Sequence, residues 1–162
     1  MRLDVLAVGR RDPFAEATDD YLKRARQAGR ALGWRGPALS VVEAPKALRG
    51  AERQAREAHL LQDALPDSSS VVLLDERGKD EGSSALARRL ADQSERGAPG
   101  VAFLIGGADG FPEALRRDLR DRQLATLAFG RSVWPHMMVR LMLAEQLYRA
   151  ATILTGHPYH RA

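Results

Sequence analysis

Short apolar runs alternate with longer stretches of helical periodicity along the whole chain, and this alternation most constrains the fold. Strand-like runs occupy residues 2–8, 38–44, 70–75, 100–107 and 123–129. Helical patterns occupy residues 14–29, 47–65, 83–97, 112–122 and 135–156. The runs SVVLLD and GVAFLIGG are continuously apolar, as in strands buried on both faces. The pattern therefore predicts an α/β fold with a mostly parallel sheet and helices on both faces.

Local signals predict where the helices begin and end. Gly29 follows the first helical pattern, and Pro66 stops the second. Ser83 and Ser84 are suited to capping the third helix, and Pro112 to the first position of the fourth.

The helix over 135–156 is the longest expected, at about five to six turns. Its apolar residues cover more of the circumference than one sheet face needs. They include Met137, Met138, Leu141, Met142 and Leu147. A helix that is apolar on several sides is buried on several sides, so we expect this one to form a homodimer interface.

The length and composition indicate an ordinary globular chain, and residues 1–162 are expected to form one domain. The absence of cysteine excludes disulfides, thiolate metal sites and cysteine nucleophiles. The N-terminal apolar run spans only about five residues, too short for a signal-peptide core or a membrane span. We therefore expect a cytoplasmic protein with neither a membrane nor a metal partner.

The charge is biased toward arginine. Lys+Arg total 25 against 21 Asp+Glu, which gives a net charge of +4 and a pI near 9.9. Only Lys23, Lys46 and Lys79 are lysines. Arginine suits phosphate and can stack on bases, although genomic base composition also inflates its use. The balance is compatible with a nucleic-acid partner without establishing one.

Three loops are the candidate ligand sites, because open α/β sheets bind ligands beyond the carboxyl ends of their strands. These loops follow Asp75, Ile105 and Phe129. The first, LLDERGKDEGSS, is polar and could be simply solvated. The second, FLIGGADGF, lets a ligand approach the main chain closely, but it fits neither G-x-G-x-x-G nor the phosphate loop of nucleotide triphosphatases.

The third loop, LAFGRSVWPHMMVR, is apolar and aromatic. Two interpretations stay open from the residues alone. The loop either folds onto its own core or forms a pocket for an aromatic ring such as adenine, with free main-chain groups at the ring's polar edge.

Three motifs in this order, FLIGGADG, WPHMMVRLMLAEQLYRA and HPYHR, resemble the ribosomal RNA large subunit methyltransferase H family. This family belongs to the SPOUT superfamily. The opening LDVLAVGR and the strand VVLLDERGK also match, so the resemblance covers essentially the whole chain, while residues 27–65 match only in general pattern.

The resemblance implies a C-terminal trefoil knot, an obligate homodimer, and methyl transfer from S-adenosyl-L-methionine to N3 of a pseudouridine in large-subunit (23S) ribosomal RNA. The sequence shows no separate RNA-binding domain, which favours ribosomal RNA presented within a large structured particle, an assembled ribosome, over free RNA. The cofactor contacts that the resemblance implies are Leu74, Gly106, Phe129, Gly130, Arg131, Ser132, Val133 and Trp134. The chain departs from the family at Ala108 and Asp109, and by carrying Arg131 and Trp134, which could alter cofactor affinity.

The catalytic residues that the resemblance implies are Arg140, Tyr159, His160 and Arg161. In this interpretation the tail and arginines of the long helix line the RNA side of the site across the dimer. Tyr159 would stack on a base, Arg161 would hold a phosphate or an imide oxygen, and His157 or His160 would accept a proton. The alternative is a tail held down only by packing.

Other expectations concern the remaining polar groups. Arg140 and Arg149 lie nine residues apart, so they point to opposite helix faces; one faces RNA while the other pairs with Glu145. His136 is a neutral hydrogen-bonding group or a helix cap, and His59 lies on the surface. Three other functions stay open: methylation of another RNA nucleotide, RNA binding without catalysis, and binding of a small molecule by an α/β protein.

Overall fold

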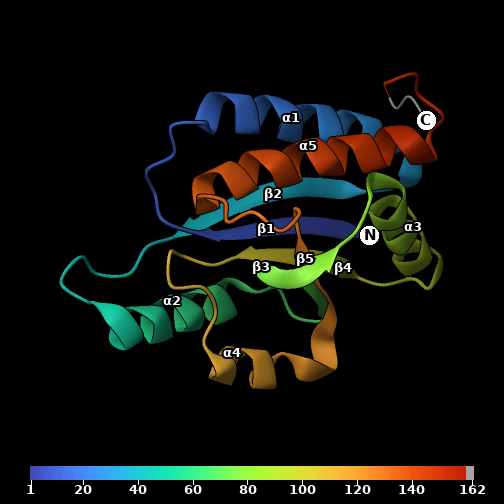
Figure 1. Cartoon of the computed structure of the whole chain (residues 1–162). Coiled ribbons are helices and arrows are strands. Elements are labelled where there is room, and N and C mark those ends of the chain that lie inside the picture. The colour runs from blue at the N-terminus through green and yellow to red at the C-terminus, as the bar shows by residue number, and fades with distance from the viewer. Residues whose placement is uncertain (160–162) are drawn as a thin grey trace.

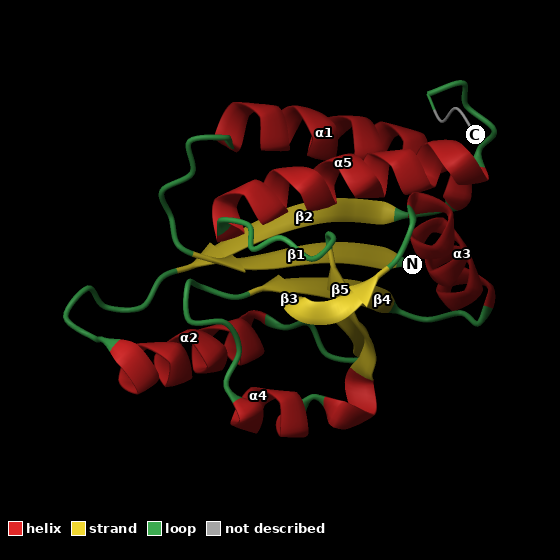
Figure 2. Ribbon diagram, in the orientation of Figure 1, coloured by secondary structure: helices red, strands yellow, loops and turns green. Residues whose placement is uncertain are grey.

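One five-stranded sheet forms the centre of the molecule, as the computed structural model of residues 1–159 shows (Figures 1 and 2). Its strands are β1 (Arg2–Val8), β2 (Arg35–Val42), β3 (Ser69–Asp80), β4 (Gly100–Ile105) and β5 (Gln123–Ala128). Their order in the sheet is β2-β1-β4-β3-β5, and every neighbouring pair is parallel. The predicted α/β fold with a parallel sheet is confirmed.

Helices cover both faces of this sheet (Figure 2). They are α1 (Ala15–Gly29), α2 (Gly50–Ala64), α3 (Ser83–Glu95), α4 (Glu113–Asp118) and α5 (His136–Leu154), with short 3-10 turns η1 (Arg30–Leu32) and η2 (Arg120–Arg122). One buried cluster joins the sheet to α1, α3 and α5, and a second joins the opposite face to α2 and α4. Within residues 1–159, no helix is both long enough and apolar enough to cross a membrane.

The central position of β4 in the sheet explains why the sequence of this strand is continuously apolar. All six of its residues are buried, because β1 and β3 flank it and helices cover both of its faces. A strand in that position has no solvent-facing side, so the alternation of apolar and polar residues disappears. The same reasoning applies to Val71–Leu74 of β3, which are also buried.

One helix start and two sets of cap residues differ from the sequence predictions. Pro112, expected at the first position of the fourth helix, is instead the N-cap residue of α4. The helix expected from residue 47 begins at Gly50, because Pro45–Arg49 form a turn in which the N–H of Leu48 donates to the Pro45 carbonyl (3.1 Å). The expected serine caps of α3 are wrong, since Gly82 is the N-cap residue. The Ser83 hydroxyl instead donates to Oε1 of Gln146 on α5 (2.7 Å), so it joins two helices.

Strand β3 extends beyond the predicted 70–75. Its first part aligns Leu74 with Leu127 of β5, and after a bulge Lys79 aligns with the same Leu127. Gly78 allows this return, because a Cβ there would lie 2.5 Å from the carbonyl carbon of Leu127. The chain after Leu74 therefore leaves the sheet and rejoins it, which opens space at the strand ends.

Candidate functional site

A cavity of about 1000 Å³ lies at the carboxyl edge of the sheet. Its walls are residues 74–77 at the bulge of β3, the loops after β4 and β5, the first turn of α5 and Gln54 of α2. These are the three loops that the strand-end rule selects. The volume lies at the upper end of the range typical of small-molecule sites.

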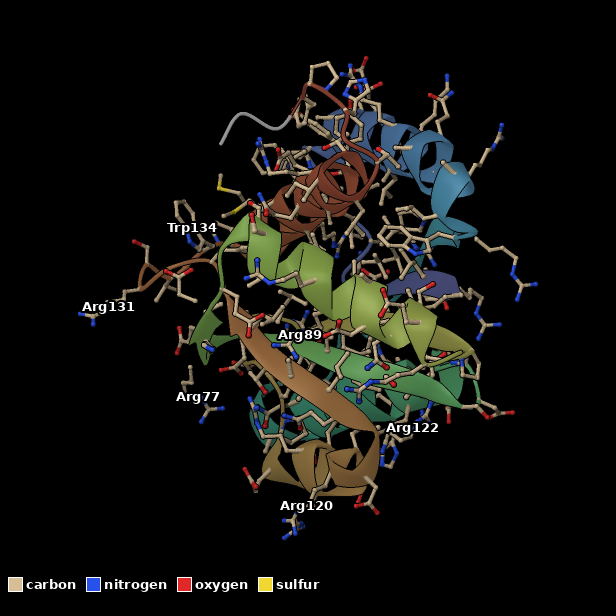
Figure 3. All side chains as sticks on the ribbon, turned by 90° about the vertical axis from the view of Figure 1, so that its right-hand side faces the viewer. Arg77, Arg89, Arg120, Arg122, Arg131 and Trp134 are labelled. Atoms are coloured by element: carbon tan, nitrogen blue, oxygen red, sulfur yellow. The ribbon has the colours of Figure 1, made fainter. Side chains whose placement is uncertain are left out.

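Most of the residues expected to contact a cofactor line this cavity. They are Leu74, Gly106, Phe129, Gly130, Ser132, Val133 and Trp134. Arg131 does not line it; Figure 3 shows its side chain at the tip of the loop, directed away from the molecule. The structure thus brings together segments that lie up to 60 positions apart in the sequence, from Leu74 to Trp134.

A hydrogen bond between its two ends stabilises the loop between β5 and α5. The indole Nε1–H of Trp134 donates to the carbonyl of Phe129 (2.8 Å), and Gly130 turns the chain with a φ of +80°. In the part of the chain that the structure describes, the N–H groups of residues 131–134 donate to no main-chain carbonyl. Val133 is 78% exposed. The loop therefore combines uncovered apolar surface with free main-chain donors, so of the two interpretations the pocket fits it better.

The glycine loop after β4 is fixed from outside by α2. The amide nitrogen of Gln54 donates to the carbonyl of Asp109 (2.6 Å). Buried Glu57 lies against Gly107, where an added Cβ would come within 2.5 Å of its Oε2 atom. Arg53 donates to the other oxygen of Glu57 (2.8 Å). A side chain at position 107 would displace this carboxylate from its place against the glycine loop.

The carboxylate of Asp75, where β3 leaves the sheet, forms ion pairs with two arginines. The side chain and main-chain N–H of Arg77 both donate to Oδ1 of Asp75 (3.2 and 2.9 Å), while Arg116 of α4 donates to Oδ2. Burial opposes ionisation, but these bonds and the charge of Arg116 outweigh it and lower the pKa of Asp75. Asp75 is therefore an ionised group on the cavity wall.

His136 lines the cavity from the first turn of α5. Its Nε2 atom lies close to Gly9, where an added Cβ would be only 3.1 Å away. Burial, and then the charge of Arg140, lowers the pKa of this imidazole. The expectation of a neutral imidazole agrees with this shift. The cap interpretation does not hold, because Pro135 is the N-cap residue and no side chain caps the helix.

Arg140 lies in the interior instead of on an RNA-facing surface, contrary to the expected catalytic position. It is 2% exposed, and its Nη2 atom donates to the carbonyls of Val8 and Gly9. Nη1 lies 3.6 Å from the Asp12 carboxylate. The guanidinium therefore satisfies carbonyls at the end of β1, which would otherwise be buried without donors.

The other end of α5 carries the described part of the tail. Arg149 pairs with Glu145 (2.5 Å), as expected for one of the two arginines. Tyr159 packs on Tyr148, with ring centroids 4.5 Å apart, and its hydroxyl donates to Oε1 of Glu145 (3.1 Å). Burial, and then hydrogen bonds with Tyr21 and Glu145, raises the pKa of Tyr159. His160 and Arg161 lie outside the described residues.

Sequence reasoning missed several groups at this site. Asp75 ends a predicted strand, so the strand-end rule could have named it. Gln54 and Glu57 carry no such signal, because only the packing of α2 under the sheet brings them to the glycine loop. His59 is exposed on the same helix, as expected.

Comparisons with known proteins agree with this architecture. The family model described as "Predicted SPOUT methyltransferase" matches residues 1–160. The chain is 47% identical over 164 residues to the ribosomal RNA large subunit methyltransferase H of Bradyrhizobium diazoefficiens, with 100% of both chains covered. It is 47% identical to the protein of that name from Paramagnetospirillum magneticum, and 48% to that from a Ruegeria species, each with 99% of both chains covered. The chain therefore belongs to the SPOUT methyltransferase family.

Proposed function

We propose that this protein transfers a methyl group from S-adenosyl-L-methionine to N3 of a pseudouridine in large-subunit ribosomal RNA. The observation that carries the proposal is the cavity formed by the three strand-end loops in a chain of this family. The names of the relatives, ribosomal RNA large subunit methyltransferase H, support the choice of substrate.

The cavity wall suits an adenosine-containing methyl donor. Leu74, Ile105 and Phe129 supply apolar surface for an aromatic ring. The free N–H groups of residues 131–134 are donors for the polar edge of such a ring. When bound, S-adenosyl-L-methionine supplies an electrophilic methyl group on a sulfonium, so the protein itself needs no nucleophile.

The acceptor nitrogen needs a base and a stabilising charge. N3 of pseudouridine bonds to the methyl carbon as the methyl–sulfur bond breaks, and the N3 proton must leave. Positioning the two reactants together supplies much of the rate enhancement in such a reaction. We assign proton removal to the histidines of the tail, His157 or His160, and charge stabilisation to Arg161.

A second copy of the chain would complete the site. The cavity lies at the start of α5 and Tyr159 lies beyond its end, and a helix of 19 residues spans about 28 Å. The described part of the tail, which ends at Tyr159, therefore lies away from the cavity of its own chain, and Figure 1 shows the two ends of α5 on opposite sides of the molecule. In a homodimer the partner's tail would line the RNA side of the cavity.

The exposed face of α5 supports such a homodimer. Met138, Leu141 and Met142 are partly exposed and follow helical spacing, so they form one apolar face. None of the three packs against the buried cores of its own chain. Apolar surface of this kind is typical of protein interfaces.

The experiment that tests the function is mass mapping of modified nucleotides in ribosomal RNA from cells that lack this protein. We expect the loss of one N3-methyl group from a pseudouridine of the large subunit and its return when the gene is restored. An unchanged modification pattern would refute the proposal. A lost methyl group at another nucleotide would keep the enzyme class and correct the substrate.

A further inference from the structure

The loops after β1 and β2 lie at the same edge of the sheet as the cavity. Ala7 of β1 aligns with Ile105 of β4, and the N–H of Gly9 donates to the carbonyl of Val42 (2.8 Å). Gly9 in turn contacts His136 of the cavity wall. Figure 1 shows both loops on the side of the molecule where α5 begins. A macromolecule that covers the cavity would therefore also meet these two loops.

These loops present cations to solvent. Arg10, with 82% of its side chain exposed, and Arg11 come from the first loop. Lys46 and Arg49, both exposed, come from the second. Within residues 1–159, Arg11 and Lys46 have no ion-pair partner, and the nearest pair of Arg10, with Glu43, is long at 3.8 Å. We call Arg10, Arg11, Lys46 and Arg49 the basic rim.

The framework of the protein holds the basic rim in place. Asp12, in the same loop as Arg10 and Arg11, is turned inward with 7% of its side chain exposed and faces Arg140. Its Oδ1 atom accepts the N–H of Phe14 (2.8 Å). The acidic group of the loop is thus neutralised inside, while the two arginines beside it point to solvent. In the second loop, Arg49 donates to the carbonyls of Lys46 and Leu48.

Three arginines on another side of the molecule are engaged in structural contacts. Figure 3 shows Arg77, Arg89 and Arg122 around α3 and β5. Arg89 pairs with Glu81 (2.5 Å), and Arg77 with Asp75 (3.2 Å). Arg122 donates to the carbonyls of Pro66 (2.6 Å) and Ser69 (3.1 Å). These guanidinium groups have less capacity for an external ligand than the side chains of Arg10, Arg11 and Lys46 in the basic rim.

We propose that the basic rim binds phosphates of the RNA strand that presents its base to the cavity. This inference rests on the proposed function, which supplies the RNA. Phosphate contacts from arginine and lysine fix the register of a nucleic acid without reading its sequence. The rim would thereby position the target base, whereas the donor cavity and the partner's tail would act on it.

The test compares two triple variants that each remove two arginines and one lysine. The rim variant is Arg10→Gln/Arg11→Gln/Lys46→Gln. The matched control is Lys23→Gln/Arg30→Gln/Arg35→Gln. These exposed residues lie on α1, on η1 and at the start of β2, which is the end of that strand away from the basic rim. The measurements are the affinity for ribosomes over a range of KCl concentrations and the affinity for S-adenosyl-L-methionine by calorimetry.

We expect the rim variant to bind ribosomes at least about tenfold more weakly at low salt, with the slope of log affinity against log salt reduced by about 1 per lost contact. Its cofactor affinity and the ribosome binding of the control should match the wild type. Equal weakening in both variants would overturn the proposal, as would an unchanged salt slope in the rim variant. The proposed function is judged separately, by methylation with the wild-type protein.

Discussion

At the residue scale, Gly106 is a cavity-lining position where an added side chain would disturb the glycine loop. A Cβ there would lie 3.3 Å from the carbonyl carbon of Gly110 and 3.3 Å from Cε1 of Phe111. Gly106→Val should therefore displace the glycine loop, at a cost of about 1–3 kcal/mol. We expect calorimetry to show at least about a tenfold loss of S-adenosyl-L-methionine affinity in a folded protein.

The control for this substitution is Gly82→Val, because a Cβ on Gly82 meets no atom within 4 Å. It adds the same side chain at an exposed position outside the cavity and should leave cofactor binding unchanged. Undiminished binding by Gly106→Val would show that the donor is held elsewhere.

His136 gives the protein a stability that depends on pH. Its lowered pKa means that the unfolded chain binds a proton more readily than the folded one. The free energy of unfolding should therefore rise with pH up to about the ordinary histidine pKa of 6.5 and fall as the pH drops below it. His136→Gln should flatten this rise in denaturant titrations, whereas His59→Gln, on the exposed side of α2, should preserve it. A profile that is equally steep in both variants would contradict this account.

The position of Arg140 shows what sequence reasoning could not supply at this scale. Helical spacing correctly separates Arg140 from Arg149 and names Glu145 as the partner of one of them, which in the structure is Arg149. It does not say which face of α5 meets the sheet, so the burial of Arg140 under the end of β1 was not predictable. The three loops could be named, because they follow strands whose direction the sequence pattern predicts, whereas the individual contact residues in them were implied by the family resemblance.

At the scale of elements, the apolar face of α5 carries the proposed dimer. Leu141→Glu places a charge in the centre of that face, and burying an unpaired charge in an interface is strongly unfavourable. We expect sedimentation to show a dimer for the wild type and a monomer for the variant at micromolar concentration. Val41→Glu is the control: Val41 is 39% exposed on the edge strand β2, so its variant should remain dimeric. A monomeric wild type would refute the dimer.

The elements themselves were largely predictable. Each of the five expected strands and five expected helices is present, because strand and helix periodicities differ clearly in this sequence. The errors fall where tertiary contacts override local signals: Ser83 joins α5 instead of capping α3, and β3 returns to pair with β5 after Leu74.

At the scale of the whole molecule, the strand order could not be obtained from the sequence pattern. Alternation of strands and helices predicts parallel direction, but the order β2-β1-β4-β3-β5 depends on which side each crossover takes. The trefoil knot and the homodimer implied by the resemblance stay predictions.

Because each proposed site takes its cavity from one chain and its tail from the other, two inactive variants should restore activity when they form a mixed dimer. Deleting residues 157–162 should remove methyl transfer while preserving cofactor binding. Gly106→Val should leave the tail intact but the cavity largely empty, when the cofactor concentration is kept well below the Kd of that variant. When the two chains are co-expressed, half of the dimers are mixed and each mixed dimer has one intact site, so about a quarter of wild-type activity should return. No recovery in isolated mixed dimers would mean that each chain supplies its own tail.

The central claim is that this protein methylates a pseudouridine of large-subunit ribosomal RNA. The most direct measurement incubates purified protein with ribosomes and isotopically labelled S-adenosyl-L-methionine, and then locates the label by mass spectrometry of the RNA fragments. The account predicts one labelled methyl group per large subunit, on N3 of a pseudouridine, and none with the variant that lacks residues 157–162. Label on another nucleotide, no label at all, or full activity of the shortened variant would contradict it.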